Sequence, residues 1–220
     1  LPDSKDPTTA PVSIIQHADI KRMLLTQKSY VEGAFDLGLY AARLFDDTTT
    51  LADEAERKQA HELLDLLTPI VKSWPSEFCL KANELAIQIL GGHGYTREYP
   101  VEQYYRDNRL NPIHEGTHGI QSLDLLGRKL AQNGGAGLKQ LIRLIADTGA
   151  RAQQYPSLTA LREPLEHLLN RLQSVTLGLL TDLAQGKVNS SLANSALYLK
   201  VFGHTVIGWR WLEQAIRAEE

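Results

Sequence analysis

The sequence predicts an all-α protein, an antiparallel helical bundle with an additional helical extension toward its C-terminus. Three observations support this fold class. Apolar residues recur at spacings of three and four over most of the chain, which is the period of amphipathic helices. No segment shows the strict alternation of a half-buried strand, and clusters of Gly and Pro separate the periodic stretches. With 220 residues, the chain is long enough for its helices to enclose a substantial core.

The first elements follow from local signals. Residues 1–11 contain three prolines among small polar residues and are expected to form a linker. Residues 19–45 carry a clear amphipathic pattern and predict a long helix. A second helix is expected to begin after the threonines at 48–50, which resemble an N-terminal cap. Because Pro69 lacks an N–H group, this helix should kink there or stop shortly before it.

The middle of the chain is less regular. A third helix is expected from about Ser76, just after Pro75, to the glycines at 91 and 92. Residues 93–112 are rich in Gly, Pro, Tyr and charge, and no regular element is predicted there. Another helix is expected from about residue 117 to residue 130.

The Asn-Gly-Gly sequence at 133–135 predicts a break between two parts of the chain. We therefore expect a helical domain over residues 12–133 and a helical extension over residues 134–220. Amphipathic patterns predict three helices in the extension, at about 138–153, 158–185 and 191–218.

Composition excludes several classes of protein. A formal charge of −3 provides no basic excess for nucleic-acid phosphates, so no nucleic-acid partner is expected. Cys79 is the single cysteine, which rules out an intrachain disulfide and favours a cytoplasmic location. No apolar run approaches the roughly 18 residues that a membrane span requires. Since the sequence does not begin with Met and lacks a signal-peptide core, we expect it to be an internal piece of a longer chain.

The most informative segment extends from Gln88 to Gln121 and reads QILGGHGYTREYPVEQYYRDNRLNPIHEGTHGIQ. It resembles the acyl-CoA dehydrogenase family, whose C-terminal helical domain carries the pattern Q-I-x-G-G-x-G-[YF]-x-x-E-Y-P-V-E-x-x-x-R-D followed by I-x-E-G-T-x-x-I-Q. The alignment needs no gap over these 34 residues. The resemblance to the family extends more loosely over residues 12–130. The stretch SIIQHADIKRMLLTQKSYVEGA at 13–34 resembles the larger branch of the family that includes 3-methylmercaptopropionyl-CoA dehydrogenases, and that branch also carries a helical extension.

The resemblance implies a reaction and a catalytic base. Members of the family remove the α-proton of an acyl-CoA thioester and transfer a β-hydride to FAD, which leaves a trans-2-enoyl-CoA. Glu115 falls on the glutamate of the E-G-T motif, the usual base. A carboxylate held at hydrogen-bonding range in a water-poor site suits this weakly acidic proton. Without the surrounding motif, Glu115 would be read as a surface glutamate stabilised by a helix N-terminus.

The resemblance also implies residues that contact FAD. Thr117 matches a threonine that touches the cofactor, although it could equally be a helix N-cap. Gln88, Gly91 and Gly92 match a turn that meets the adenosine part of FAD in a neighbouring subunit, although a glycine there also suits a helix C-cap. If that contact exists, the protein forms at least a dimer, and a homodimer or homotetramer is expected. An electron-transfer flavoprotein is the expected electron acceptor.

Arg106 and Asp107, with Glu98 and Glu102, are expected to form a charge network that shapes the loop presenting Glu115.

A competing motif overlaps the same residues. His114 to His118 spell H-E-x-x-H, the signature of zinc proteases in which two histidines one helical turn apart bind the metal. That site needs a continuous helix, which Pro112 and Gly116 disfavour, and it needs a third ligand. We therefore expect no metal site.

Two further alternatives come from the resemblance and the fold class. An acyl-CoA oxidase shares the fold and the glutamate but passes electrons to oxygen. A helical bundle can also act as a non-catalytic interaction module. Because the family holds its flavin largely through other domains, these 220 residues alone are expected to be inactive and to bind FAD weakly or not at all.

Overall fold

The structure is a computed structural model that describes residues 10–220, and every regular element in that part of the chain is a helix. The all-α prediction is therefore confirmed. Most of the predicted linker, residues 1–9, lies outside the described residues. The α-helices are α1 (Ala18–Thr50), α2 (Glu54–Leu90), α3 (Val101–Asn108), α4 (His118–Asp124), α5 (Ala136–Ala152), α6 (Thr159–Ala184), α7 (Val188–Leu192) and α8 (Ser195–Glu219). Short 3-10 turns cover Ile14–Gln16, Gly91–Tyr95, Gln132–Gly135 and Pro156–Leu158, and a π-turn covers Leu125–Lys129.

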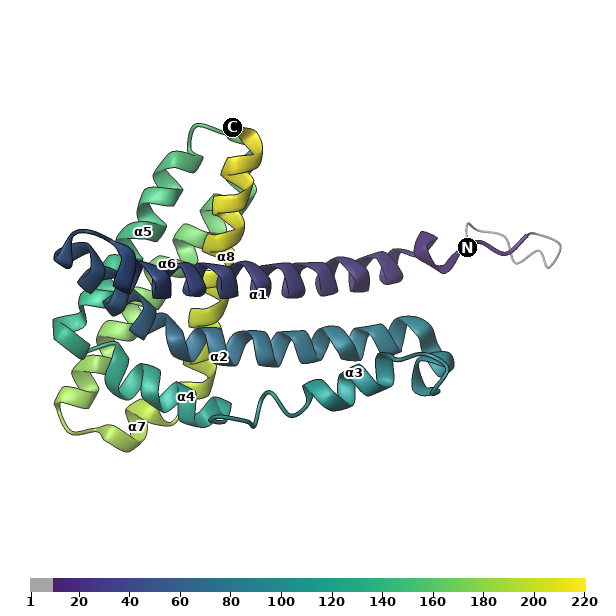
Figure 1. The fold of residues 1–220 in the computed structure, drawn as a ribbon, viewed down its shortest axis with the longest axis horizontal. Coiled ribbons are helices and arrows are strands. Elements are labelled where there is room, and N and C mark those ends of the chain that lie inside the picture. Colours follow the sequence, from purple (N-terminus) through teal and green to yellow (C-terminus); the bar gives the residue numbers. More distant parts are fainter. Residues whose placement is uncertain (1–9) are drawn as a thin grey trace.

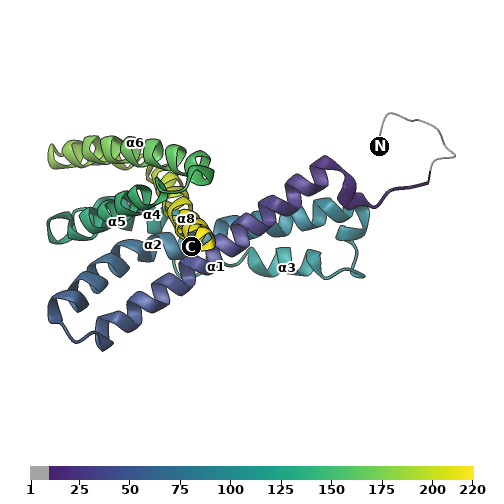
Figure 2. The same cartoon turned by 90° about the horizontal axis from the view of Figure 1, so that it is seen from above.

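The two longest helices, α1 and α2, pack side by side as an antiparallel hairpin. Figure 1 shows this pair as a long arm, with α3 beneath the outer half of α2 and the remaining helices gathered around the inner half. Seen from above in Figure 2, α5 and α6 lie beside the base of the arm, and α8 passes between them and α1. The helix α8 contacts α1, α2, α4, α5 and α6, which makes it the central element of the inner half.

Buried apolar side chains from α1, α2 and α8 form the centre of the core. Leu37, Leu67, Ile70 and Val206 are completely shielded from solvent. Truncating a buried leucine of this kind to alanine typically costs about 2–5 kcal/mol. This shared core packs the C-terminal helices onto the arm. Among residues 10–220, no helix combines the length and apolar character that crossing a membrane requires.

The boundary between the first two helices differs from the prediction. The threonines at 48–50 do not cap α2, because they form the last turn of α1, where their hydroxyl groups donate to the carbonyls of Phe45 and Asp46. The N-cap of α2 is Asp53, whose carboxylate accepts a hydrogen bond from the backbone N–H of Ala55 at 2.9 Å. Three successive hydroxyls that bond back to the preceding turn thus resemble a cap in sequence but end a helix here.

The helix does not stop before Pro69 and no separate helix begins at Ser76, because α2 continues through both Pro69 and Pro75. Each proline removes one backbone hydrogen bond, which disfavours a helix interior. Against that cost, Leu67, Ile70 and Trp74 are all buried in the core on this stretch. The burial of apolar surface therefore outweighs the local preference of proline.

The two elements on either side of Glu115 compare differently with the prediction. The segment 93–112, which carried no clean period, contains α3, an eight-residue helix that buries none of its side chains and is shorter than the window over which a helical period is judged. The helix predicted at 117–130 is present, as α4 continued without a break by the π-turn at Leu125–Lys129.

The Asn-Gly-Gly break lies where it was expected, because Asn133, Gly134 and Gly135 all take positive φ angles of 51°, 66° and 76°. The helices α5, α6 and α8 follow at nearly the predicted positions, with α7 as an additional short turn. Arg210 of α8 forms an ion pair with Asp36 of α1 at 2.6 Å, and this pair ties the extension to the arm. Whether residues 12–133 and 134–220 fold as separate domains stays a prediction.

Candidate active site

Glu115 lies in the turn between α3 and α4, at an unusual backbone conformation. Its φ angle is 51°, in the left-handed region that a non-glycine residue seldom adopts, and Gly116 follows with φ 99°. The Glu115 side chain is 79% exposed in this chain, and the His114 imidazole approaches it, with 3.7 Å between Nε2 and Oε1. The turn therefore presents the carboxylate outward instead of pairing it with another part of this chain.

The carboxylate borders a hollow of about 360 Å³ between α2 and the turn. The α2 side supplies Val71, Lys72, Pro75, Ser76 and Cys79, and the other side supplies Asn108, Asn111, His114 and Glu115. The thiol of Cys79 has a raised pKa because burial disfavours the thiolate. Glu115 is the only carboxylate among the residues that line this hollow.

The turn is tied to α2 through side-chain hydrogen bonds. The ammonium group of Lys72 donates to the carbonyl of Asn111 at 2.6 Å. Asn111 donates to Asn108 at 2.7 Å, and Asn108 donates in turn to Asn83 on α2 at 2.7 Å. This chain of amides fixes the segment that leads into Glu115.

A second hydrogen bond holds Glu115 from the other side. The side-chain amide of Gln121, on α4, donates to the backbone carbonyl of Glu115 at 3.2 Å. Gly116 suits this site because its φ of 99° disfavours other residues, and a Cβ atom there would also displace the Gln121 amide nitrogen, which would lie 2.8 Å away. The position of α4 therefore sets the position of the Glu115 backbone.

The predicted charge network does not form. Among residues 10–220, none of Glu98, Glu102, Arg106 and Asp107 makes an ion pair with another side chain. The helix α3 carries most of these residues on faces that contact solvent. Uncharged amides and Lys72 take over the role that was expected of the charged residues.

Gln88, Gly91 and Gly92 lie at the outer tip of the arm, at the opposite end of α3 from Glu115 (Figure 1). Gly91 takes φ 59° and its N–H donates to the carbonyl of Gln88, which ends α2. A Cβ atom on either glycine would meet nothing within 4 Å, and the Gln88 side chain is exposed. The C-cap role of this turn is therefore present, and its backbone is open to an external group.

Thr117 is the N-cap of α4, where its hydroxyl oxygen accepts a hydrogen bond from the N–H of Ile120 at 3.4 Å. At this length the bond is weak. The capping role is thus present in the structure, and contact with a flavin stays a prediction.

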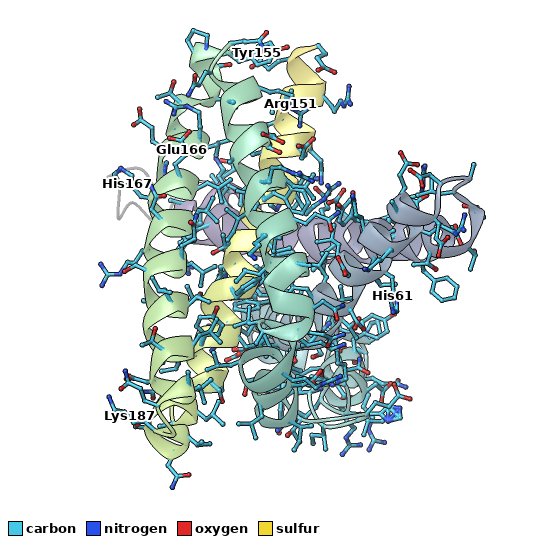
Figure 3. The ribbon with its side chains drawn as sticks, turned by 90° about the vertical axis from the view of Figure 1, so that its left-hand side faces the viewer. His61, Arg151, Tyr155, Glu166, His167 and Lys187 are labelled. Atoms are coloured by element: carbon cyan, nitrogen blue, oxygen red, sulfur yellow. The ribbon has the colours of Figure 1, made fainter. Side chains whose placement is uncertain are left out.

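The residues of the H-E-x-x-H string do not share a helix. His114 and Glu115 lie in the turn and His118 begins α4, with left-handed residues between the two histidines. Two other histidines, His61 and His167, lie on different sides of the molecule (Figure 3). Within residues 10–220, no group of three or more His, Cys, Asp or Glu side chains is arranged to hold a metal ion.

The comparison with protein families shows to which family the chain belongs. Residues 3–130 match the family described as acyl-CoA dehydrogenase, C-terminal domain. The chain belongs to the acyl-CoA dehydrogenase family. In addition, residues 140–220 of this acyl-CoA dehydrogenase chain match the family described as acetyl-CoA dehydrogenase C-terminal like. The resemblance inferred from the motif is therefore confirmed.

Individual relatives agree with this assignment. The 3-methylmercaptopropionyl-CoA dehydrogenase of Ruegeria pomeroyi is 34% identical over 94% of the chain and 35% of its own length. The broad-specificity linear acyl-CoA dehydrogenase FadE5 of Mycobacterium tuberculosis is 33% identical over 98% of the chain and 36% of its own length. The chain thus spans about a third of the length of these curated relatives.

A solved structure shares the fold of this acyl-CoA dehydrogenase chain. Caenorhabditis elegans ACDH-11, in complex with C11-CoA, superposes with a TM-score of 0.68 at 22% identity. The match covers 89% of this chain and 33% of that protein. At this level of identity, the comparison supports the helical architecture alone.

Some residues that shape the turn were missed in the sequence. Lys72 is one of several charged residues on α2, and nothing in its spacing indicates that it reaches Asn111. Gln121, by contrast, is the last residue of the family motif, and its position there was a usable signal for a role near Glu115.

Proposed function

We propose that this chain is the C-terminal portion of an FAD-dependent acyl-CoA dehydrogenase, and that Glu115 removes the α-proton of an acyl-CoA thioester to give a trans-2-enoyl-CoA. The observation that carries the proposal is the position of Glu115 in the E-G-T turn. There, left-handed backbone angles present a carboxylate that is 79% exposed, at a residue that borders the hollow beside α2.

The proposed chemistry divides the work between the chain and its cofactor. When bound, FAD accepts the hydride that leaves the β-carbon. The carboxylate of Glu115 accepts the α-proton, a task that requires a base within hydrogen-bonding reach of the substrate. The bonds of Gln121 and Lys72 hold the turn, so the base does not have to be ordered at each turnover.

The residues proposed to contact FAD fit that role chemically. Gly91 and Gly92 offer an exposed backbone at which no side chain obstructs a ligand, and Gln88 offers an exposed amide beside it. Thr117 offers a hydroxyl at the start of α4. Because these two groups lie at opposite ends of α3, we propose that they serve the flavins of two different subunits of a homodimer or homotetramer.

The remaining partners are also proposals. The acyl-CoA substrate follows from the family, and an electron-transfer flavoprotein is the proposed electron acceptor. A caffeyl-CoA reductase–Etf complex subunit of Acetobacterium woodii is 33% identical over 49% of the chain and 25% of its own length. The cytoplasmic location inferred from the single cysteine stays a prediction.

An anaerobic titration of the full-length protein with acyl-CoA thioesters of increasing length tests this proposal. The visible absorbance of the flavin reports its reduction. We expect wild type to bleach with at least one thioester and Glu115→Gln to stay oxidised, because the amide is nearly isosteric but cannot accept the proton. A parent protein without flavin, or a Glu115→Gln variant reduced as fast as wild type, contradicts the proposal.

The same preparation distinguishes the alternatives. An acyl-CoA oxidase reoxidises its flavin rapidly when air is admitted and releases hydrogen peroxide, whereas a dehydrogenase requires an added electron acceptor. A non-catalytic interaction module carries no reducible flavin. A zinc enzyme retains stoichiometric zinc after dialysis.

A further inference from the structure

The helix α8 reaches the short helix that follows Glu115. The hydroxyl oxygens of Ser122 on α4 and Ser195 at the start of α8 lie 2.9 Å apart, and both side chains are buried, with 0% and 7% exposure. Ser122 already donates its single hydroxyl proton to the carbonyl of Gly119 at 2.8 Å. Ser195 is therefore the donor in the contact between the two serines.

A charged contact reinforces this hydroxyl pair one helical turn further along α8. The ammonium group of Lys200 lies 2.6 Å from the carboxylate of Glu77 on α2, and Lys81 contacts the same oxygen at 2.9 Å. Burial opposes the charged form of Glu77, but hydrogen bonds from Lys200 and Lys81 outweigh that effect and lower its pKa. Glu77 is thus a charged partner for α8 at neutral pH.

The Lys200 contact fixes α8 on α2, and the contact between the two serines leads from α8 to the backbone of Glu115 by a short path. Ser122 is adjacent in sequence to Gln121, whose amide donates to the Glu115 carbonyl. The Glu115 side chain is 79% exposed and its carboxylate is approached only by the neighbouring His114, at 3.7 Å, so its position depends mainly on its backbone. A left-handed glutamate costs roughly 1–2 kcal/mol and persists only where its surroundings fix it.

We propose that the C-terminal extension is a positioning element of the active site, in which Ser195 and Lys200 of α8 hold α4 in place and thereby hold Glu115 over the hollow beside α2. Ser195 and Lys200 are positioning residues, because they act through Ser122, Gln121 and Glu77 and do not touch the reacting atoms. This inference rests on the proposed role of Glu115.

The physical reason for such a device is the sensitivity of proton transfer to geometry. A displacement of about 1 Å at a reacting group can cost on the order of a hundredfold in rate. On one side, the turn is anchored to α2 by Lys72 and the amides. On the other side, α4 continues into the π-turn at Leu125–Lys129, where Leu125 and Leu126 are buried, and the Ser195 hydroxyl ties α4 to α8 as a second anchor.

The test compares Ser195→Ala with wild type in the full-length holoenzyme. The matched control is Ser174→Ala, which removes an exposed hydroxyl from α6 of the same extension. Two measurements are made on each protein. One is the rate of flavin reduction by saturating thioester together with the KM for that thioester, and the other is hydrogen–deuterium exchange of the peptide that covers residues 109–121.

We expect Ser195→Ala to reduce its flavin about tenfold more slowly with little change in KM, because the base is present but less well placed. Exchange in the 109–121 peptide should accelerate, and flavin content should not change. Ser195→Thr, which restores a hydroxyl, should recover most of the rate. Lys200→Gln should produce a smaller effect in the same direction, and Ser174→Ala should match wild type.

The exchange measurement keeps the inference testable independently of turnover. Unchanged exchange in the 109–121 peptide of Ser195→Ala overturns the proposal, even if no thioester reduces the wild-type flavin. A rate loss that accompanies an equal loss of flavin, or that Ser195→Thr does not recover, also overturns it. If the flavin of Glu115→Gln is reduced as fast as that of wild type, the proposed function fails. This outcome differs from a Ser195→Ala variant that behaves as wild type, which contradicts only the positioning role of α8.

Discussion

At the scale of single residues, the positions that the structure constrains most are those where α4 and α8 approach other helices. Glu115 adopts a backbone conformation that suits glycine, at the position of the glutamate in the E-G-T motif. Gly116, beside it, leaves room for the amide of Gln121. Glu115 thus has an unfavourable backbone conformation, and the neighbouring contacts hold it in that conformation.

A second close approach lies where α8 crosses α2. A Cβ atom on Gly203 would lie 2.5 Å from the Trp74 ring, which is itself buried and stacked on Phe78 with 4.5 Å between ring centroids. We predict that Gly203→Ala destabilises the chain by about 1–3 kcal/mol, because the ring has no free space into which to move.

Gly178→Ala on α6 is the matched control. A Cβ atom there meets nothing within 4 Å, so alanine should stabilise the helix by roughly 0.5–1 kcal/mol. Urea unfolding followed by far-ultraviolet circular dichroism measures both free energies of unfolding. Shifts of the same sign for the two variants contradict this reading of the α2–α8 contact.

At the scale of elements, the sequence predicted those helices whose periodicity comes from burial. The pattern of α1 is clear because Met23, Leu37 and Leu44 face the core at helical spacing. The helix α3 has eight residues and no buried side chain, so its pattern is shorter than the window over which a helical period is judged. In α2 the local signal of two prolines pointed the wrong way, because only the tertiary packing of Leu67, Ile70 and their neighbours keeps the helix continuous.

The same distinction applies to the candidate site. Glu115 and Thr117 were found because a contiguous motif identifies them. The contacts that hold them join residues far apart in the chain, such as Lys72 with Asn111 and Ser122 with Ser195. Pairing over such sequence distances leaves no trace in a single sequence. The structure was therefore needed to find the anchors of the turn.

Two histidines at the junction of α2, α4 and α8 predict a pH dependence. Burial is the main cause that lowers the pKa of His118, with Lys72, Lys200 and Arg109 acting in the same direction and Glu77 opposing them. Burial also lowers the pKa of His204, which packs against Trp74 and Phe78. As the pH falls below about 6.5, the unfolded chain takes up these protons before the folded chain does, so the free energy of unfolding decreases.

We therefore expect a lower urea midpoint at pH 5.5 than at pH 7.5. The double variant His118→Gln, His204→Gln should lose most of this difference. The carboxylates with lowered pKa values, Asp65, Glu77 and Glu213, contribute to the loss of stability only at more acidic pH. A double variant with an unchanged difference between the two pH values shows that other groups are responsible.

At the scale of the whole molecule, α1 has two apolar faces. One face lies in the core, and the other exposes large side chains along the arm. The exposed members are Leu24, Leu25, Val31, Phe35 and Leu39. A continuous exposed apolar surface of this kind indicates a contact surface. The carboxylate of Glu115 is also exposed. The candidate functional residues therefore lie on the surface of this chain and are not enclosed within it.

This outward arrangement predicts how the 220-residue chain behaves when it is produced alone. It should fold into helices, because α1, α2 and α8 share a core of completely buried side chains. It should nevertheless bind FAD weakly or not at all. Ligand sites generally bury most of the ligand surface, whereas Gln88, Gly91, Gly92 and Thr117 lie on open surface at two ends of α3.

Circular dichroism measures the helix content of the 220-residue chain, and isothermal titration calorimetry with FAD measures its affinity for the cofactor. The full-length protein is the positive control for both measurements. We expect a strongly helical spectrum, no flavin after gel filtration, and no reduction by acyl-CoA thioesters. A stoichiometric flavin that copurifies with the 220 residues contradicts the prediction, because it requires these residues to enclose the cofactor themselves or through self-association along α1. If the 220-residue chain is helical but lacks flavin while the full-length protein retains it, then residues outside this chain are needed to enclose the cofactor.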